Sequence, residues 1–396
     1  MQTPCEDPRA RTSGRRGASS SVRIAVVGAG PAGAAASYHL ARRGHQVVLL
    51  DRSAFPRAKT CGDWITRGAM QELEHMELPW ARLREQVERG AEIHGSTVAA
   101  PNGQTSHVPC RAPTHGCCVP RSMFDARLVA RALDVGCRME RQSVRTLDAL
   151  RADHDLVIDA RGVYAGQPNT VAIRAYWTVP TSHVDTRTLS TVQLFTVERF
   201  RMGYEWIFPV HVTPTHVELN LGVGIWREEY DARGVKIRDD FERFVQQNPV
   251  ARQLARVATE RSRTRGHHLA LAAERQVVAT EGVLRVGDAA NLTDPITGEG
   301  IANAMLSGRL AAQAIDEAHD AADAQRRWQH AYQTRMLPEL MAAVRLRTLL
   351  VGTRRKNIAI WALRRSTRLA ERFHGSLEGV VSYRDVLPLP RMPSWR

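Results

Sequence analysis

Lysine is nearly missing from this sequence of 396 residues. Only Lys59, Lys236 and Lys356 occur among the 55 lysine and arginine residues, so the formal charge of +14 is almost entirely arginine. The arginines are spread along the whole chain, whereas a nucleic-acid-binding protein usually gathers its basic residues on one face. We therefore expect no nucleic-acid partner.

Long apolar runs and regularly spaced cysteines are also missing. No run of 18 or more apolar residues occurs, which predicts that no helix crosses a membrane. The six cysteines lack the spacing of a metal site, and Cys117 and Cys118 are adjacent, so we expect free thiols, no metal and a cytoplasmic protein. Residues 1–21 include the polar stretch RTSGRRGASSS, which predicts a disordered leader rather than a signal peptide.

A dinucleotide-binding pattern follows this leader. Residues 22–28 (VRIAVVG) predict a buried strand that runs into a G-x-G-x-x-G turn formed by Gly28, Gly30 and Gly33, then a helix and a second strand. The glycines permit a tight turn and a close approach to a pyrophosphate, which the helix N-terminus attracts. Asp51 ends the second strand, where its carboxylate can accept hydrogen bonds from a ribose. An acid at this position suits FAD or NAD and disfavours NADP.

A second glycine-rich stretch lies about 250 residues later, in VGDAANLTDPITGEGIANAM (residues 286–305). It predicts a strand that ends at Gly287-Asp288 and a helix that begins after Gly298-Glu299-Gly300. Asp288 could accept a hydrogen bond from a ribityl hydroxyl, and the helix N-terminus could stabilise the charge that gathers on a reduced flavin. The alternative is a buried strand and a capped helix with no ligand. Together, the two stretches indicate FAD held at both ends.

Arg121 and the segments around it extend this prediction. Arg121 begins a predicted helix, from which its cation could reach the flavin pyrophosphate or ribityl chain; the alternative is a surface arginine beside a helix turn. Residues 155–162 (DLVIDARG) predict another buried strand that ends near the nucleotide. The predicted cofactor contacts are Gly28, Gly30, Gly33, Asp51, Arg52, Arg121, Gly287, Asp288, Pro295, Gly298, Gly300 and Ile301.

The segments, in this order, resemble the geranylgeranyl reductase family of FAD-dependent oxidoreductases, within the hydroxylase-like flavoproteins. The resemblance covers about residues 22–312. It includes PRAKTCGDWIT (56–66), PRSMFDARL, AIRAYW (172–177), GYEWIFP (203–209) and NLGVG (220–224). It implies an α/β fold with a Rossmann-like FAD-binding domain, an inserted β-sheet substrate domain and a C-terminal helical region. The implied ranges are 22–95, 118–165 and 275–325 for the FAD-binding domain, 96–117 and 166–274 for the sheet domain, and 326–396 for the helices.

A substrate pocket between the inserted sheet and the flavin is also implied. Tyr204, Trp206 and Phe208 match the family's Tyr-x-Trp-x-Phe-Pro motif and are expected to line the pocket together with Trp177. Cys61 matches the cysteine next to the flavin, so Cys61 or Tyr204 could protonate the substrate. Core packing remains the alternative for the aromatic residues, and a small apolar filler is the alternative for Cys61. Family members commonly carry a basic residue where Val210 stands, which disfavours a prenyl diphosphate substrate.

The C-terminal region is strongly basic, with nine basic residues and one acidic residue between positions 345 and 372. Such a helix could rest on an anionic membrane or steer an acidic substrate, so a peripheral membrane contact stays open. The favoured interpretation is the solvated side of helices that pack on their own domain.

Three functions follow from these patterns. The favoured one is reduction of C=C bonds in a hydrophobic small molecule, isoprenoid or natural-product-like, by hydride from the flavin. The alternative is an FAD-dependent monooxygenase that hydroxylates a secondary metabolite. A halogenase is disfavoured, because the tryptophan halogenases need a lysine between flavin and substrate and only Lys59 lies near the flavin motifs. A non-redox cyclase or binding module that contains flavin is the third. No second G-x-G-x-x-G occurs, so we expect an external electron donor, either NAD(P)H or a partner flavin reductase.

Overall fold

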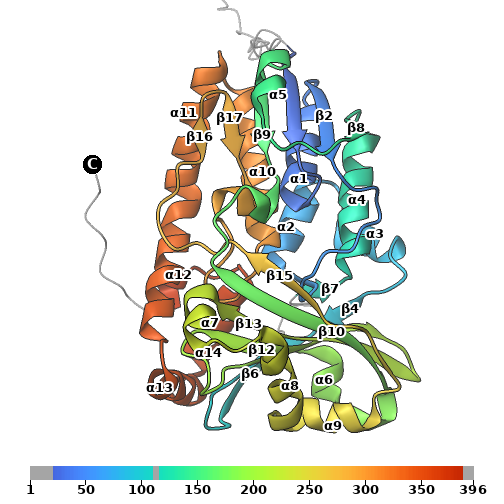
Figure 1. Ribbon diagram of the computed structural model, residues 1–396, viewed down its shortest axis with the longest axis vertical. Helices are drawn as coiled ribbons and strands as arrows, with labels where there is room; N and C mark the ends of the chain where they lie inside the picture. The colour runs from blue at the N-terminus through green and yellow to red at the C-terminus, as the bar shows by residue number, and fades with distance from the viewer. Residues whose placement is uncertain (1–20, 110–115, 387–396) are drawn as a thin grey trace, which may run out of the picture.

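The computed structural model describes residues 21–109 and 116–386. Two large sheets lie at opposite ends of the molecule, and the C-terminal helices run along one side and reach both (Figure 1). The predicted leader, apart from Ser21, and residues 387–396 of the predicted helical region lie outside the described residues. The mixed α/β fold class is confirmed. None of the described helices is both long and apolar enough to cross a membrane.

The first sheet has six strands in the order β16-β17-β9-β1-β2-β8. Neighbouring strands are parallel except for β16 and β17. The central strand β1 (Arg23–Val27) contains the β-branched residues Ile24, Val26 and Val27. It is buried on both faces, as is typical of parallel strands covered by helices. The other strands are β2 (Gln46–Asp51), β8 (Arg138–Arg141), β9 (Leu156–Asp159), β16 (Ala279–Thr280) and β17 (Val283–Arg285).

Helices α1 (Pro31–Ala41) and α10 (Ile301–Asp316) pack against each other unusually closely. A Cβ atom on Gly308 of α10 would lie 2.3 Å from the carbonyl oxygen of Ala32 on α1, so only glycine fits there. Because these helices follow the two glycine-rich stretches, this contact brings together turns that are far apart in the sequence. Further helices around this sheet are α2 (Arg67–His75), α3 (Trp80–Glu85), α4 (Arg121–Asp134), α5 (Asp148–Asp153) and α11 (Ala321–Ala331).

The second sheet has eight strands, seven of them in the order β14-β10-β13-β12-β11-β5-β6, with β15 paired to β10. Its long antiparallel strands are β10 (Thr170–Pro180), β12 (Gly203–Val212) and β13 (His216–Trp226). The others are β5 (Gly95–Ala99), β6 (Thr105–Pro109), β11 (Val192–Phe195), β14 (Glu260–Arg261) and β15 (Arg265–Leu269). A separate three-stranded sheet is formed by β3 (Trp64–Thr66), β4 (Ala91–Ile93) and β7 (Gly116–Cys118).

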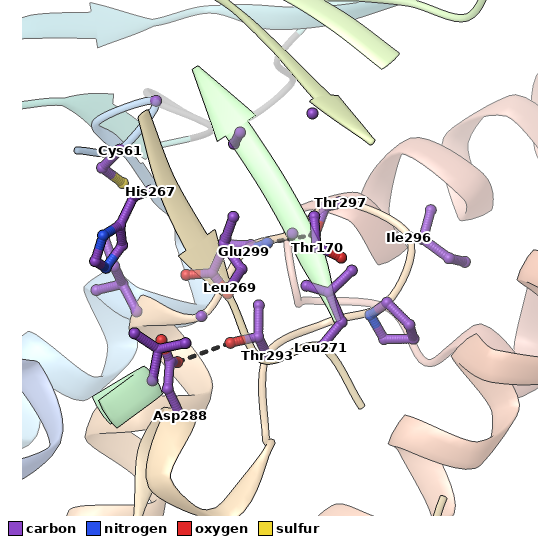
Figure 2. A pocket seen from close by; sticks show the side chains of 18 of the residues that line it. Cys61, Thr170, His267, Leu269, Leu271, Asp288, Thr293, Ile296, Thr297 and Glu299 are labelled. Atoms are coloured by element: carbon purple, nitrogen blue, oxygen red, sulfur yellow. Dashed lines mark hydrogen bonds between the residues drawn. The ribbon is translucent and has the colours of Figure 1, made fainter. Parts of the chain in front are cut away.

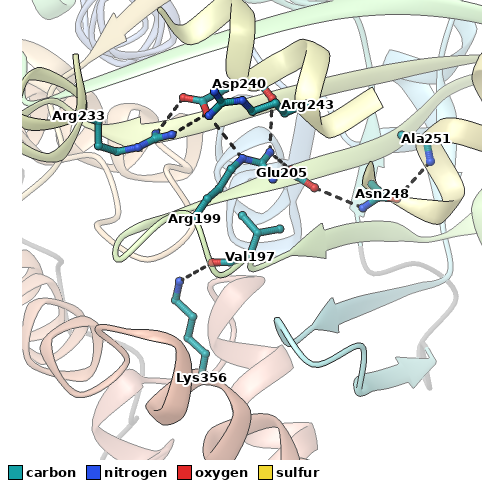
Figure 3. Close-up of polar contacts among 9 residues, drawn as sticks. All are labelled: Val197, Arg199, Glu205, Arg233, Asp240, Arg243, Asn248, Ala251 and Lys356. Carbon is teal, nitrogen blue, oxygen red and sulfur yellow. Dashed lines mark hydrogen bonds and ion pairs between the residues drawn. The ribbon is translucent and has the colours of Figure 1, made fainter. Parts of the chain in front are cut away.

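Successive side chains of the long strands point to opposite faces of the second sheet. One face packs an apolar cluster that includes Ile207 and Leu221 against helices α8 (Ile237–Gln247) and α9 (Pro249–Val257). On this side Glu205, 1% exposed, forms an ion pair with Arg199, and Arg199 and Arg233 contact the buried carboxylate of Asp240 (Figure 3). The opposite face turns toward the first sheet. Two shorter helices are α6 (Thr186–Ser190) and α7 (Arg227–Arg233).

The C-terminal helices pack against the face of this sheet that is opposite α8 and α9. Leu346, Ile360 and Phe373 join one buried cluster with Trp206 and Phe208 of β12. A π-helical stretch, Tyr332–Met336, connects α11 to the next helix. The helices are α12 (Leu337–Leu349), α13 (Thr353–Arg365), α14 (Thr367–Leu377) and α15 (Tyr383–Val386).

Candidate flavin and substrate site

One cavity of about 1160 Å³ lies between the two sheets and the C-terminal helices. It begins at the first glycine-rich turn, passes the second, and continues along the inward face of the eight-stranded sheet to α12, α13 and α14. Of the predicted site residues, the following line it: Gly28, Gly30, Asp51, Arg52, Cys61, Arg121, Tyr204, Trp206, Phe208, Gly287, Asp288, Pro295, Gly298, Gly300 and Ile301.

The first glycine-rich turn combines a tightly packed side with an open side. A Cβ on Gly28 would lie 2.2 Å from the carbonyl oxygen of Ala160, and one on Gly33 would lie 1.8 Å from that of Gly28. These two glycines therefore serve backbone packing, and Gly33 does not line the cavity. A Cβ on Gly30 would meet only the Arg57 guanidinium, at 3.6 Å, and would otherwise project into the cavity. Gly30 thus leaves the space that a pyrophosphate needs, next to an α1 N-terminus without a side-chain cap.

Asp51 is fixed by the same turn. Its two carboxylate oxygens accept hydrogen bonds of 2.8 Å from the backbone amides of Ala29 and Ser53. The carboxylate lines the cavity at the end of β2, where a ribose hydroxyl could reach its remaining lone pairs.

The second glycine-rich stretch lies next to the first, since a Cβ on Gly287 would be 3.0 Å from the Ala32 side chain. Its residues Asp288, Thr293 and Glu299 line the cavity (Figure 2). Asp288 accepts a 2.8 Å hydrogen bond from the Thr293 hydroxyl. The carboxylate of Glu299 accepts a 2.8 Å hydrogen bond from the Ala302 amide and so caps the start of α10, a contact that the sequence analysis did not foresee. Burial raises the pKa of Glu299 to about 7, and nearby Asp294 contributes in the same direction.

Cys61 and Arg121 lie together in the middle of the cavity. The Arg121 guanidinium forms two hydrogen bonds with Asp125, at 2.7 and 2.9 Å, and is buried. The surface alternative for Arg121 is therefore wrong, because its charge is neutralised inside the protein. Burial raises the pKa of the Cys61 thiol, although the Arg121 cation opposes this effect. Cys61 is therefore a neutral thiol at neutral pH.

Lys59 and His267 are two further titratable groups at the cavity. Burial lowers the pKa of Lys59 to about 8, and the nearby carboxylate of Asp288 partly offsets this. Burial also lowers the pKa of His267 to about 4, and Lys59 adds to the shift. Figure 2 shows His267 beside Cys61. His267 was missed because a lone histidine on β15 carries no spacing signal.

A buried polar cluster fixes the Cys61 loop against the second sheet. Asp63, which is fully buried and has a φ of 67°, accepts hydrogen bonds from the Arg121 amide, the Tyr176 hydroxyl and the Asn220 amide group. Asn220 also donates to the carbonyl oxygen of Cys61, at 2.7 Å. Asp63 and Asn220 lie within segments that carry the family resemblance, but no sequence pattern marks either residue for this role.

The aromatic stripe of β12 is both core and cavity wall. Trp206 and Phe208 are buried, yet both line the cavity with Tyr204. The ring of Trp206 covers Gly222 of β13, where an added Cβ would lie 2.1 Å from it. The Tyr204 hydroxyl donates to the carbonyl oxygen of Thr297. Its proton is thus committed to a hydrogen bond, and burial raises its pKa.

The prediction that Trp177 lines the substrate pocket is wrong. Trp177 shares the parity of Ile173 and Ala175 on β10, and all three pack in the apolar cluster on the far face of the sheet. Ala172, of the opposite parity, lines the cavity instead. Val210 is fully buried and likewise does not line the cavity.

Comparisons with known proteins agree with this geometry. Residues 21–181 match the family model of the FAD binding domain. The chain is 27% identical over 328 residues to the menaquinone reductase of Mycolicibacterium smegmatis, covering 73% of this chain and 75% of that protein. It is 29% identical over 331 residues to the digeranylgeranylglycerophospholipid reductase of Methanoculleus marisnigri, covering 76% and 78%. The chain is an FAD-dependent oxidoreductase, and its sequence is similar to these two reductases.

Solved structures share the fold of this flavoprotein. A geranylgeranyl bacteriochlorophyll reductase-like protein from Thermoplasma acidophilum has a TM-score of 0.69 at 19% identity, covering 87% of this chain and 92% of the other. The flavin-dependent brominase Bmp2 has a TM-score of 0.68 at 19% identity, covering 90% and 93%. At these identities the likeness concerns the fold alone. The predicted FAD cofactor and the family resemblance are confirmed.

Proposed function

We propose that this protein reduces carbon–carbon double bonds in a hydrophobic molecule with a long apolar chain, such as an isoprenoid. One observation carries the proposal: the cavity continues without interruption from the residues predicted to hold FAD into an apolar branch under the C-terminal helices. That branch is lined by Val98, Leu194, Leu346, Leu350, Leu363, Leu369, Phe373 and Leu377. The names of the curated relatives, menaquinone reductase and digeranylgeranylglycerophospholipid reductase, support the same reaction class.

In this proposal the residues of the two glycine-rich turns hold the cofactor. Gly30 and the α1 N-terminus would hold the pyrophosphate, Asp51 would hold the ribose, and Asp288 would hold the ribityl region. Arg121, Arg52 and the segment from Pro295 to Ile301, which also line the cavity, would supply the remaining contacts. Bound reduced FAD supplies the hydride. The apolar walls exclude water and align the chain of the substrate along the cavity.

Cys61 is the proton donor that the surroundings favour. Its raised pKa keeps the thiol protonated, and the thiol lies in the cavity between Arg121 and the aromatic stripe. After hydride transfer to one carbon, this proton can pass to the neighbouring carbon. The thiolate that forms is stabilised by the Arg121 cation. Tyr204, the other predicted donor, instead orients the Thr297–Gly298 turn through its hydrogen bond.

Single-turnover kinetics test the proposal. Enzyme reduced under anaerobic conditions should be reoxidised on mixing with a polyprenyl substrate that has no quinone ring, such as a digeranylgeranylglycerophospholipid, with a gain of two mass units per carbon–carbon double bond reduced. Cys61→Ala should slow this step at least about tenfold, as expected for loss of a general acid, while a Cys117→Ala control should not. Reoxidation only with oxygen, coupled to a hydroxylated product, would favour the monooxygenase alternative. No substrate-dependent redox change would favour a non-redox role.

The proposal includes an external electron donor that reduces the flavin. The two candidates are NAD(P)H and a partner flavin reductase.

A further inference from the structure

Helix α13 lies at one corner of the molecule (Figure 1). It exposes both apolar and basic side chains. Leu349 at the end of α12 is 47% exposed, Ile358 is 61% exposed and Trp361 is 50% exposed. We call this region the α13 surface and define it by Leu349, Arg354, Arg355, Ile358, Trp361 and Arg365. Three of the seven large hydrophobic side chains exposed among the described residues lie on it.

The order of these side chains along the helix is regular. Arg354, Ile358, Trp361 and Arg365 follow at spacings of four, three and four residues, so they form one stripe. Apolar side chains occupy its centre and a cation stands at each end. The Arg365 guanidinium lies 5.2 Å from the ring centre of Trp361, close enough to stack on it.

The opposite side of α13 is packed, so this stripe is not the helix's inward face. Ile360 and Leu363 are buried in the apolar cluster beneath it. Lys356 is also buried, and its ammonium group donates to the backbone carbonyls of Val197 and Phe200 (Figure 3). The one lysine of the helix is thus used internally, whereas its four arginines remain at or near the surface. The helix contains no acidic residue.

The α13 surface also surrounds one mouth of the cavity. Leu349, Arg355 and Ile358 are exposed, and each of them also lines the cavity. The apolar branch of the cavity therefore reaches solvent between apolar side chains, where a water-filled mouth would be unfavourable.

We propose that the α13 surface docks this protein on an anionic lipid bilayer, with Ile358, Trp361 and Leu349 at the boundary between headgroups and acyl chains. The arginines would pair with lipid phosphates while their aliphatic stems remain in apolar contact. Tryptophan favours this boundary because its ring is apolar and its N–H is polar. The mouth then opens into the bilayer, and a long apolar substrate enters without crossing water; this last clause rests on the proposed function.

A bilayer fits the surface better than a protein partner does. The apolar stripe is narrow, carries an arginine at each end and lies on a helix without acidic residues, as in helices that lie on anionic membranes. The cavity mouth within the stripe needs an apolar medium that can pass a substrate molecule, which a stably bound protein would block.

Vesicle sedimentation with the full-length FAD-loaded protein tests the docking. Binding should be strong to phosphatidylcholine vesicles that contain phosphatidylglycerol, weak to phosphatidylcholine alone, and reduced by high salt. The variants are Arg354→Glu with Arg365→Glu, and Ile358→Ser with Trp361→Ser. Each pair should weaken binding at least about tenfold, since a basic residue at an anionic surface contributes roughly a fivefold change in partition.

Matched controls lie on other surfaces of the protein. Val277→Ser replaces a side chain that is 63% exposed, and Arg326→Glu replaces one that is 69% exposed. Both should bind vesicles within about twofold of the parent protein. Unchanged vesicle binding by both pairs of surface variants would overturn the proposal, as would equal binding to neutral and anionic vesicles. A dimer in solution that Ile358→Ser with Trp361→Ser dissociates would also overturn it, in favour of a second copy of this chain.

Substrate presentation separates docking from chemistry. With docking correct, Arg354→Glu with Arg365→Glu, whose side chains do not line the cavity, should lose turnover of vesicle-embedded substrate but keep turnover of detergent-dispersed substrate. Absence of vesicle binding with normal turnover in detergent removes the docking proposal and leaves the proposed function standing. Vesicle binding without turnover of either vesicle-embedded or detergent-dispersed substrate would remove the proposed function and leave the docking proposal standing.

Discussion

The side-chain amide of Asn220 donates hydrogen bonds to the carbonyl oxygen of Cys61, at 2.7 Å, and to the carboxylate of Asp63, at 2.8 Å. Its oxygen accepts a 3.0 Å hydrogen bond from the indole N–H of Trp206. One residue of β13 therefore fixes both the loop that carries the Cys61 thiol and the indole ring of Trp206 in the cavity wall. The proposed proton donor and the substrate sheet are held in one geometry by a buried side chain.

Replacing Asn220 with alanine should loosen this geometry. We expect Asn220→Ala to leave FAD bound, to lower kcat about tenfold, and to speed alkylation of Cys61 by iodoacetamide, because the loop loses its anchor. Peptide mapping of the alkylated protein measures the thiol directly.

Asn248→Ala is the matched control, since Asn248 caps α9 and bonds Glu205 on the opposite face of the same sheet. It should cost about 1 kcal/mol of stability without changing Cys61 reactivity. Equal alkylation rates in both variants would show that Asn220 does not position the loop.

Gly30→Val and Asp288→Ala should both yield protein without yellow flavin. The valine side chain would occupy the space that Gly30 leaves open in the cavity, and the alanine would remove the carboxylate at the ribityl end. Gly30→Val should still fold, since the nearest atom to its Cβ is the far end of the Arg57 side chain. Flavin absorbance per mole of protein, with circular dichroism for the fold, measures the outcome.

Gly266→Val is a control for adding a side chain at an exposed glycine. A Cβ on Gly266 would have its nearest neighbour, the carbonyl oxygen of Ala172, at 3.5 Å. This variant should retain FAD. Full FAD occupancy in both Gly30→Val and Asp288→Ala would show that the two glycine-rich turns do not bind FAD.

Much of this architecture could be predicted from the sequence because it follows local rules. The strand, glycine turn and helix around Gly30 carry their spacing within about 30 residues, and the same holds for the stretch around Asp288. The contact between the two turns could only be inferred from the shared ligand, since it depends on the packing of Gly308 on Ala32.

The errors have a different origin. The sequence motif marks β10 as a strand near the substrate, but which parity faces the cavity depends on tertiary packing, so Trp177 was placed on the wrong face. Asp63 and Asn220 carry no motif, because the hydrogen bond between them joins positions 157 residues apart. The sequence also could not decide whether the basic C-terminal region packs on its own domain or meets a membrane. The inward direction of Lys356 and the outward direction of Trp361 depend on how α13 packs against the rest of the protein.

The aromatic wall should control substrate binding rather than cofactor binding. Trp206→Ala enlarges the cavity. Gly222→Ala displaces the Trp206 ring and the neighbouring backbone of β10, because the added Cβ would lie 2.1 Å from that ring and 2.5 Å from the carbonyl oxygen of Ile173. We expect each change to raise KM at least about fivefold while FAD stays bound, since a mismatched apolar wall costs roughly 1–3 kcal/mol of substrate binding. Steady-state kinetics with flavin quantification separates the two effects.

Trp177→Phe is the control on the other face of the same sheet. It should lower the melting temperature and leave KM unchanged, because Trp177 packs only in the far apolar cluster. An unchanged KM in both Trp206→Ala and Gly222→Ala would mean that the aromatic stripe only packs in the core and does not bind substrate.

Glu299 should make the stability of the protein depend on pH. Its folded-state pKa is about 7, above the ordinary value of 4.5, so the folded protein binds this proton more tightly than the unfolded chain does. Stability is therefore highest with Glu299 protonated, falls as the pH rises from about 4.5 to about 7, and is constant in this respect above that. The loss should amount to about 2 kcal/mol after allowance for partial solvent access.

Glu299→Gln keeps the oxygen that accepts the Ala302 hydrogen bond and removes the titration. The variant should match the parent protein in urea unfolding near pH 4.5 and exceed its free energy of unfolding near pH 8. Taking the difference between the two proteins at each pH cancels the separate contribution of Asp294, whose own pKa is raised by burial. A difference that stays constant across this pH range would mean that Glu299 remains ionised throughout, with its charge stabilised by the α10 N-terminus.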